Sequence, residues 1–438
     1  MRRLVIPMLL LATGAAPGLA TGSQPHDADA EVSAPRVQTL PAPLIPEAAM
    51  AEEDWRTANE TVGAFTRGHI DILRWEAENP PPSLAEPLPE GEPLAMSAAV
   101  HVALGNRPDL FAKDDMNPLT RARADIAAIA FARDVQRTWI QAVAAAQGLR
   151  RTVEAFEATE IAAELAARMT RVGNWGQDRL LREQLGLSDA GIQLAQARQQ
   201  AMSAREALAR KLGLWGDGLD FALPDELPPL PAQPLSGEGL EARALRAHPG
   251  LRLAAIEAER SQRAVGSRSV SMWNEAAEDA LSRAFATGNE NGDPLANPIT
   301  GAPVLERRRL PRGHDAEKAA STAAEAAALA VTIRSQVREA YHQYQVAYDV
   351  ARRAEENRRL GEDIQEETLL RYNGMLDSTW DLLASARDRV ERSGAAVQAL
   401  GDFWLAHANL QAVLAGADYA GPDAGSIRAA GRANAGGH

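Results

Sequence analysis

The sequence predicts a protein dominated by α-helices and built from two tandem repeats of long, antiparallel coiled-coil helical hairpins. Ala, Leu, Glu, Gln and Arg dominate its long segments, which is the composition of long helices and coiled coils. Apolar residues recur at steps of three and four over segments far longer than an average helix of about 11 residues. The two halves also match without a gap, because Val337 follows Val135, and Leu410 follows Leu208, at the same separation of 202 residues.

A shorter echo precedes each of these matching segments. Residues 103–110, with the sequence ALGNRPDL, reappear 141 positions later as ALRAHPGL over residues 244–251. A duplicated unit of long helices cannot bury its apolar seam alone. We therefore expect the two copies to pack together or into a larger assembly.

The two copies differ in length between the echo and the long matching segment. Pro108 lies 27 residues before Val135, whereas Pro249 lies 88 residues before Val337. The first copy therefore lacks 61 residues. In the second copy, these residues hold most of an ascending helix and a strand or loop insert at about 276–315.

The N-terminus has the pattern of a secretory signal peptide over residues 1–20. Arg2 and Arg3 supply the positive region, an apolar stretch follows, and Gly18 and Ala20 are small residues that suit a cleavage site. An uncleaved anchor is the alternative, but the apolar stretch is too short to span a bilayer as a helix. We expect an exported protein of a bacterial envelope.

Six segments follow the signal peptide. They are a flexible lead over 21–45, a leading helix with a Pro-rich linker over 46–94, helical repeat 1 over 95–212, a Pro/Gly-rich crossover over 213–237, helical repeat 2 over 238–416, and a disordered tail over 417–438. The leading helix is expected at about 46–78, where apolar residues recur at helical steps. These residues are Trp55, Val62, Phe65, Ile72 and Trp75.

Repeat 1 is expected to contain one long hairpin. Its first helix runs from about residue 119 to 172, and its return helix runs from about residue 177 to 212. Gly173, Asn174 and Gly176 form the turn between them, since glycine at a helix end tolerates a left-handed backbone.

Repeat 2 is expected to contain more helices than repeat 1. They span about 239–247, 249–273, 316–371 and 378–414, and Asn373 and Gly374 form the turn before the last one. We expect Gly374 to have positive φ, so that Gly374→Val disturbs the turn.

Strand signals are weak. Only residues 270–272 begin an alternation typical of a strand, and no pair of clean strands occurs over 276–312. At most a short, poorly formed β segment is expected around 270–312.

Composition and charge exclude several classes of function. A net charge of −13 argues against binding to nucleic acid or to an anionic membrane surface. The absence of cysteine excludes disulfides and thiolate metal sites. No phosphate loop, nucleophile elbow or zinc-protease motif occurs, and the eight histidines are scattered without an i, i+4 pair. We expect neither an enzyme nor a resident cofactor or metal.

Several motifs in the chain are specific. They are RYNGML at 371–376, followed by Ser378 and WDLL at 380–383, REAY at 338–341, LGLWG at 212–216, and the Arg107-Pro108 and His248-Pro249 starts. With these motifs the chain resembles the TolC family of outer-membrane efflux proteins. Within that family it resembles the branch associated with copper and other heavy-metal resistance. The resemblance covers about residues 46–416, and the chain departs from it where repeat 1 lacks the first strand-hairpin region.

The resemblance implies a homotrimer whose long helices form a hollow periplasmic barrel, with short strands closing a barrel in the outer membrane. It also implies a passive channel in a tripartite efflux system. Such a channel would export small solutes or metal ions together with a periplasmic adaptor protein and an inner-membrane pump. The protein would lie in the outer membrane with a large periplasmic part, or in the periplasm if its strands form no barrel.

The same resemblance places the two hairpin turns at periplasmic tips that dock the adaptor. The tip residues are Arg171, Val172, Gly173 and Asn174 in repeat 1, and Arg371, Tyr372, Asn373, Gly374, Met375 and Leu376 in repeat 2. Exposed apolar residues on a narrow turn favour a docking surface. Asn373 and Gly374 also suit a plain turn, and Arg371 with Tyr372 would alternatively tie neighbouring hairpins together.

Three carboxylates near the tips are candidates for a pore or gate. A ring of Asp178, Asp377 and Asp381 would favour cations, as charged rings do in channels. For Asp377, capping of the return helix is the simpler role.

A second function remains open because repeat 1 is short. The chain would then be a shortened relative without a pore, acting as a periplasmic coiled-coil scaffold or binding protein. Trimers in outer membranes would favour the channel, and release with soluble periplasm would favour the scaffold.

Overall fold

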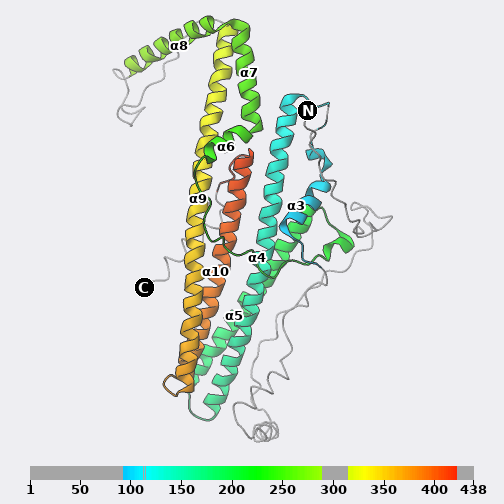
Figure 1. Cartoon of the computed structure of the whole chain (residues 1–438). Helices are drawn as coiled ribbons and strands as arrows, with labels where there is room; N and C mark the ends of the chain where they lie inside the picture. Colours follow the sequence, from blue (N-terminus) through cyan, green and yellow to red (C-terminus); the bar gives the residue numbers. More distant parts are fainter. Residues whose placement is uncertain (1–91, 112, 114, 289–313, 422–438) are drawn as a thin grey trace, which may run out of the picture.

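The computed structural model describes residues 92–111, 113, 115–288 and 314–421. Every regular element in these residues is a helix. The molecule is elongated, and its long helices α4, α5, α9 and α10 run side by side as two hairpins (Figure 1). The all-α fold class with tandem helical hairpins is confirmed.

The first hairpin consists of α4 (Pro118–Arg171) and α5 (Gln177–Leu212). The side chain of Asn117 caps α4 by accepting a hydrogen bond from the backbone N–H of Thr120 at 2.9 Å. Gly213 ends α5 with φ of +72°, a left-handed conformation that favours glycine. Local capping signals thus fix the two ends of this hairpin.

The second hairpin consists of α9 (His314–Asn373) and α10 (Thr379–Ala415). Ser378 and Asp381 form a capping box at the start of α10, in which each side chain bonds the backbone N–H of the other residue. Gly416 ends α10 with φ of +109°. Both hairpins therefore end at a glycine in the left-handed conformation.

Shorter helices accompany the hairpins. They are α3 (Met96–Gly105), η1 (Pro108–Leu110), η2 (Gly216–Leu219), α6 (Leu240–Ala247), α7 (Pro249–Val265) and α8 (Ser267–Gly288). Figure 1 shows α7 beside the upper part of α9, and α8 turning away from the bundle.

The hairpins pack through their inner helices α4 and α10, so α5 and α9 lie at the two edges. Small residues bring the inner helices close together, because a Cβ built on Gly401 would lie 3.6 Å from the Cβ of Ala144. Leu400 and Trp404 of α10 pack against the core clusters of both hairpins. The seam between the repeats is thus narrow and continuous.

The internal repeat reappears in the packing. Val135 and its counterpart Val337 are both buried in the core. Each copy also has the same anchoring hydrogen bond: Trp139 Nε1 donates to the carbonyl of Leu94 at 2.8 Å, and Tyr341 Oη donates to the carbonyl of Leu235 at 3.2 Å. The two acceptors, Leu94 and Leu235, lie 141 residues apart, and the two donors lie 202 residues apart. The same hydrogen bond therefore joins the short repeated segment to the long repeated segment in each copy.

One expectation for repeat 2 was wrong, and the expectation of at most a short β segment holds over the described residues. The helix expected over 249–273 breaks at Gly266, which has φ of +85°, into α7 and α8. Residues 270–272 lie within α8, so the alternation there does not form a strand. Val270 instead packs on Ala319 and Ala320 of α9, and a helix satisfies that contact. The rest of the expected β segment, over 289–312, lies outside the described residues.

The C-terminal tail is packed for longer than expected. Ala417 is buried, and Tyr419 Oη donates to Oε1 of Gln343 at 2.9 Å. The first residues after Gly416 therefore belong to the core of repeat 2. The signal peptide, the flexible lead, the leading helix over 46–78, most of its linker and residues 422–438 lie outside the described residues.

No helix among the described residues combines the length and the apolar character needed to cross a bilayer.

Candidate docking site at the hairpin tips

The turns of both hairpins lie at the same end of the molecule (Figure 1). Trp175, just after the first turn, packs edge to face on Trp380, just after the second, with ring centroids 6.4 Å apart. The guanidinium of Arg179 lies over both rings, at 4.3 Å from Trp175 and 4.8 Å from Trp380. The structure thus brings together the two sets of residues that the sequence placed at the tips.

The first turn closes over residues 171–176. Gly173 has φ of +79°, and the backbone N–H of Asn174 donates to the carbonyl of Met169 at 2.9 Å. Val172 closes α4 as its C-cap and leaves its side chain in solvent. This turn has the glycine conformation that the sequence predicted.

The second turn differs from the expectation. Gly374 does not have positive φ; Met375 has it instead, at +58°. A Cβ built on Gly374 would meet its nearest atom, a backbone oxygen, at 3.5 Å, which is ordinary contact. Gly374→Val therefore lacks the backbone reason for disturbing the turn. The left-handed backbone conformation lies one residue later, at Met375, where a side chain makes it unfavourable.

The apolar side chains of the turns are exposed. Met375 is 94% exposed, Leu376 is 73% exposed and Val172 is 68% exposed. Met375 combines an unfavourable backbone conformation with a side chain that buries almost nothing. Strain at an exposed residue is a reason to look for a binding role there.

The polar groups of the second turn bond each other. Arg371 Nε donates to Oδ2 of Asp377 at 2.8 Å, and its Nη2 donates to Oδ1 at 3.1 Å, a bidentate pair that closes the turn. This pairing raises the pKa of Arg371. Ser378, not Asp377, caps α10, and its hydrogen bonds lower the pKa of Asp381. The capping role expected for Asp377 is therefore wrong.

The three candidate carboxylates occupy different environments. Asp178 is exposed in the first turn of α5, where the positive end of the helix dipole favours a carboxylate. Asp377 and Asp381 are engaged by Arg371 and Ser378 within their own turn. Asp178 is thus the carboxylate left available at the tips.

A polar contact behind the tips was not anticipated from the sequence. Glu183 of α5 is 2% exposed and accepts a hydrogen bond at 2.5 Å from Nη2 of Arg387 on α10. The guanidinium of Arg387 also lies 5.6 Å from the ring centroid of Trp380. The local pattern shows Glu183 only as one acidic residue on a polar helix, so its burial arises from the contact between hairpins.

The histidines form no metal site in the described part of the chain, where no group of three or more His or acidic side chains has ligand spacing. His407 lies in an aromatic cluster 5.8 Å from Tyr344, and burial lowers its pKa. His248 caps α7, accepting at Nδ1 from the backbone N–H of Leu251 at 3.1 Å. Both residues have packing roles.

No protein-family model matches the sequence, and no curated protein matches it significantly. Among solved structures, the chain is similar to the CmeC outer membrane channel of Campylobacter jejuni, with 14% identity over 70% of this chain and 67% of that chain and a TM-score of 0.47. It is similar to VceC of Vibrio cholerae, with 13% identity over 74% and 76% and a TM-score of 0.46. It is similar to CusC, with 15% identity over 74% and 92% and a TM-score of 0.46. CmeC is described as an outer membrane channel, VceC as an outer membrane protein, and CusC through its transmembrane channel formation. The likeness concerns the helical fold alone.

Proposed function

We propose that the chain is one protomer of a trimeric outer-membrane efflux channel. It is exported and acts without catalysis. With an adaptor protein and an inner-membrane pump, it forms a passive exit duct for small solutes or metal ions. The observation that carries this proposal is that both edge helices of the four-helix row have exposed apolar stripes.

The stripes lie on opposite edges of the protomer. On α9 the exposed apolar residues include Val331, Val346, Val350, Leu360, Ile364 and Leu370, and on α5 they are Leu181, Leu185, Ile192 and Met202. Their spacing follows the helical repeat, so each set lies along one helix face. A soluble helix does not leave such a stripe in water without a partner.

Joining the two edges produces a ring. The stripe of α5 on one copy packs on the stripe of α9 on the next, which is a head-to-tail contact between unlike surfaces. Such contacts close into rings when the rotation between copies permits it. The number of three copies rests on the family resemblance, and the resulting tube of helices is the conduit.

The tips supply the docking surface for the adaptor. Val172, Met375 and Leu376 present exposed apolar side chains at the end of every protomer. In a ring, these side chains form an apolar surface that is repeated once per protomer and suits an apolar surface of a partner. Asp178 is the carboxylate best placed to contribute to a cation-favouring ring, because it is exposed in the first turn of its helix.

Cysteine cross-linking tests the ring, and the chain has no cysteine to interfere. Leu185 lies eight residues after the start of α5, and Ile364 lies nine residues before the end of α9, at matching heights above the tips. The variant with Leu185→Cys and Ile364→Cys should form disulfide-linked dimers and trimers in outer-membrane fractions.

The control pairs Leu185→Cys with Val331→Cys, on the same stripe of α9 but 33 residues higher, or about 50 Å along the helix. It should remain monomeric on non-reducing gels. Cross-linking of both pairs, or of neither, would contradict the ring.

The scaffold alternative rests on the 61 residues that repeat 1 lacks. It predicts a protein released with the soluble periplasm, with no cross-linked ring and no effect of tip variants on efflux. Fractionation separates the two functions.

A further inference from the structure

In repeat 2, a helix fills the space beside the upper part of α9. Ile333 of α9 is only 2% exposed, and Leu251 of α7 and Leu245 of α6 pack on the same core cluster. Leu329, one turn earlier, joins this cluster. The ascending helix α7 also contacts α4, so it packs on a long helix of each hairpin.

In repeat 1, the counterpart of this helix is missing. Phe131 and Ala127 of α4 correspond to Ile333 and Leu329, each 202 residues earlier. From Pro108 to the start of α4, the described residues form a single regular element, the three-residue η1. Phe131 is left partly exposed and Ala127 is exposed. We call this surface, defined by Ala127, Phe131 and the cavity beside them, the α4 gap.

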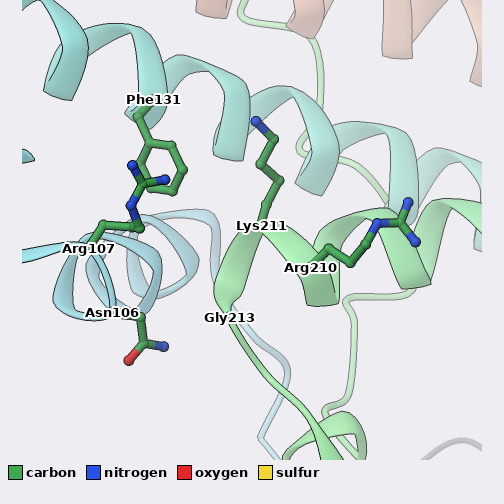
Figure 2. Close-up of a pocket in the computed structure, with 6 residues that line it drawn as sticks. All are labelled: Asn106, Arg107, Phe131, Arg210, Lys211 and Gly213. Atoms are coloured by element: carbon green, nitrogen blue, oxygen red, sulfur yellow. The ribbon is translucent and has the colours of Figure 1, made fainter. Parts of the chain in front are cut away.

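The cavity of the α4 gap is basic. It has a volume of about 190 Å³ and is lined by Asn106, Arg107, Phe131, Arg210, Lys211 and Gly213. Figure 2 shows Arg107 over the ring of Phe131 and Lys211 on the next helix. The guanidinium of Arg107 lies 5.1 Å from the ring centroid, and Lys211 Nζ lies 5.6 Å from it. Cations thus lie against Phe131, whereas apolar side chains surround its counterpart Ile333 in repeat 2.

Counter-charges neutralise only part of this basic lining. Arg107 pairs with Asp109 at 2.7 Å, and Lys211 pairs with Asp134 at 3.5 Å. Arg210 has no acidic partner within the described part of the chain. An occupant that carries acidic groups beside an apolar face would complement both the ring and the cations.

We propose that residues 46–78 of the same chain occupy the α4 gap and replace the missing ascending helix. This segment carries eight acidic and three basic residues, and its sequence predicts an amphipathic helix. It is the long apolar-striped segment of the chain that precedes the described residues. The assignment does not depend on the proposed channel function.

The connection is long enough. The described chain starts beside α4, where the carbonyl of Leu94 accepts from Trp139 Nε1 at 2.8 Å. From there α3 runs for 10 residues, about 15 Å, to Asn106 at the cavity. The 13 residues of 79–91 span up to about 43 Å when extended. They therefore reach any part of the α4 gap from Leu94.

Photo-cross-linking of the full chain tests the proposal without assuming a register. Ala127 is replaced by p-benzoylphenylalanine, the protein is irradiated, and the linked peptides are identified by mass spectrometry. We expect the linked peptides to fall within residues 46–78 and the links to lie within one chain. The same photoreactive group at Arg260, exposed on α7, is the control and should not reach residues 46–78.

Links from position 127 only to other segments, or links that join two chains, would overturn the proposal. A second measurement uses Ala127→Cys and its rate of maleimide labelling. Adding Arg210→Glu and Lys211→Glu should speed labelling about tenfold by releasing the acidic segment. The matched control Arg182→Glu, exposed on the same helix, should leave the rate unchanged. Equal rates in all three proteins would also overturn the proposal.

Discussion

The two repeats share a hairpin but differ in what surrounds it. Both copies bury the same valine and leucine positions. In both, an aromatic donor on the first long helix of the hairpin, Trp139 or Tyr341, ties that helix to the segment before it. Repeat 2 adds α7, α8 and an aromatic cluster. The difference shows that the long hairpin is the common folding unit and that the upper helices are additions to it. Because α7 contacts both α9 and α4, one ascending helix supports parts of both copies.

The aromatic cluster gives the largest predicted contrast between the repeats. Phe403 is buried against Tyr344, with ring centroids 5.4 Å apart, whereas the corresponding positions in repeat 1 are Ala201 and Ala142. Phe403→Ala should lower the free energy of unfolding by about 3–5 kcal/mol through cavity formation. Urea denaturation followed by circular dichroism measures the loss. A loss below about 1 kcal/mol would show that repeat 2 does not depend on the cluster.

Equivalent leucines provide the direct test of the comparison. Leu208 and Leu410 are both fully buried at matching positions. Leu208→Ala and Leu410→Ala should each cost about 2–5 kcal/mol, and the two values should agree within about 1 kcal/mol if the hairpins are energetically alike. If the two losses of unfolding free energy differ by more than this in the same experiment, the two leucines are packed differently despite their equal burial.

The contact between hairpins should matter less than either core. Arg387→Ala leaves the buried carboxylate of Glu183 without its partner, which we expect to cost about 1–3 kcal/mol because the arginine itself is partly exposed. Arg182→Ala, on the exposed face of α5, is the control and should change stability by less than about 0.5 kcal/mol. Matching losses in the two variants would mean that Glu183 finds another partner.

The two turns should respond differently to a β-branched residue. Gly173→Val places valine at φ of +79° and should cost about 1–2 kcal/mol. Gly374→Val, at a position without positive φ, should cost clearly less. Met375→Gly should relieve the strain of the second turn. If Met375→Gly still binds the adaptor, the Met375 side chain has no part in docking.

A pH dependence confined to repeat 2 is the smallest effect. Burial lowers the pKa of His248 and His407, whose counterparts in repeat 1 are Arg107 and Arg205. In the unfolded chain, histidine side chains titrate near pH 6.5. Between that pH and the lower pKa of the two folded histidines, the unfolded chain binds more protons than the folded chain. The stability contribution is therefore complete above about pH 6.5 and falls as the pH drops below it.

Variants of these histidines check the effect. His248→Asn keeps a side chain that caps α7, and combining it with His407→Phe should flatten the fall in melting temperature between pH 7 and 5.5. His342→Asn, at an exposed position, should leave the fall unchanged. A slope that persists in the double variant would assign the pH dependence to other groups.

Most of the candidate site was predictable because its determinants are local. Gly173 and Asn174 mark the first turn through backbone conformation, and the positions of both turns followed from the breaks between long apolar stripes. The left-handed residue of the second turn was misplaced by one, since a turn of this length is satisfied by glycine or by its neighbour. Glu183 and Arg387 escaped notice because nothing within a few residues of either reports that they meet across two hairpins.

The sequence alone determined the helices, the duplication and the two hairpins, because capping, helical periodicity and turn chemistry act over a few residues. The tertiary structure decided the row of four helices with α5 and α9 at its edges, the break at Gly266 and the shared support from α7. It also decided the basic α4 gap. These features depend on which distant surfaces fill each other's space, and packing resolves that only when the whole chain is assembled.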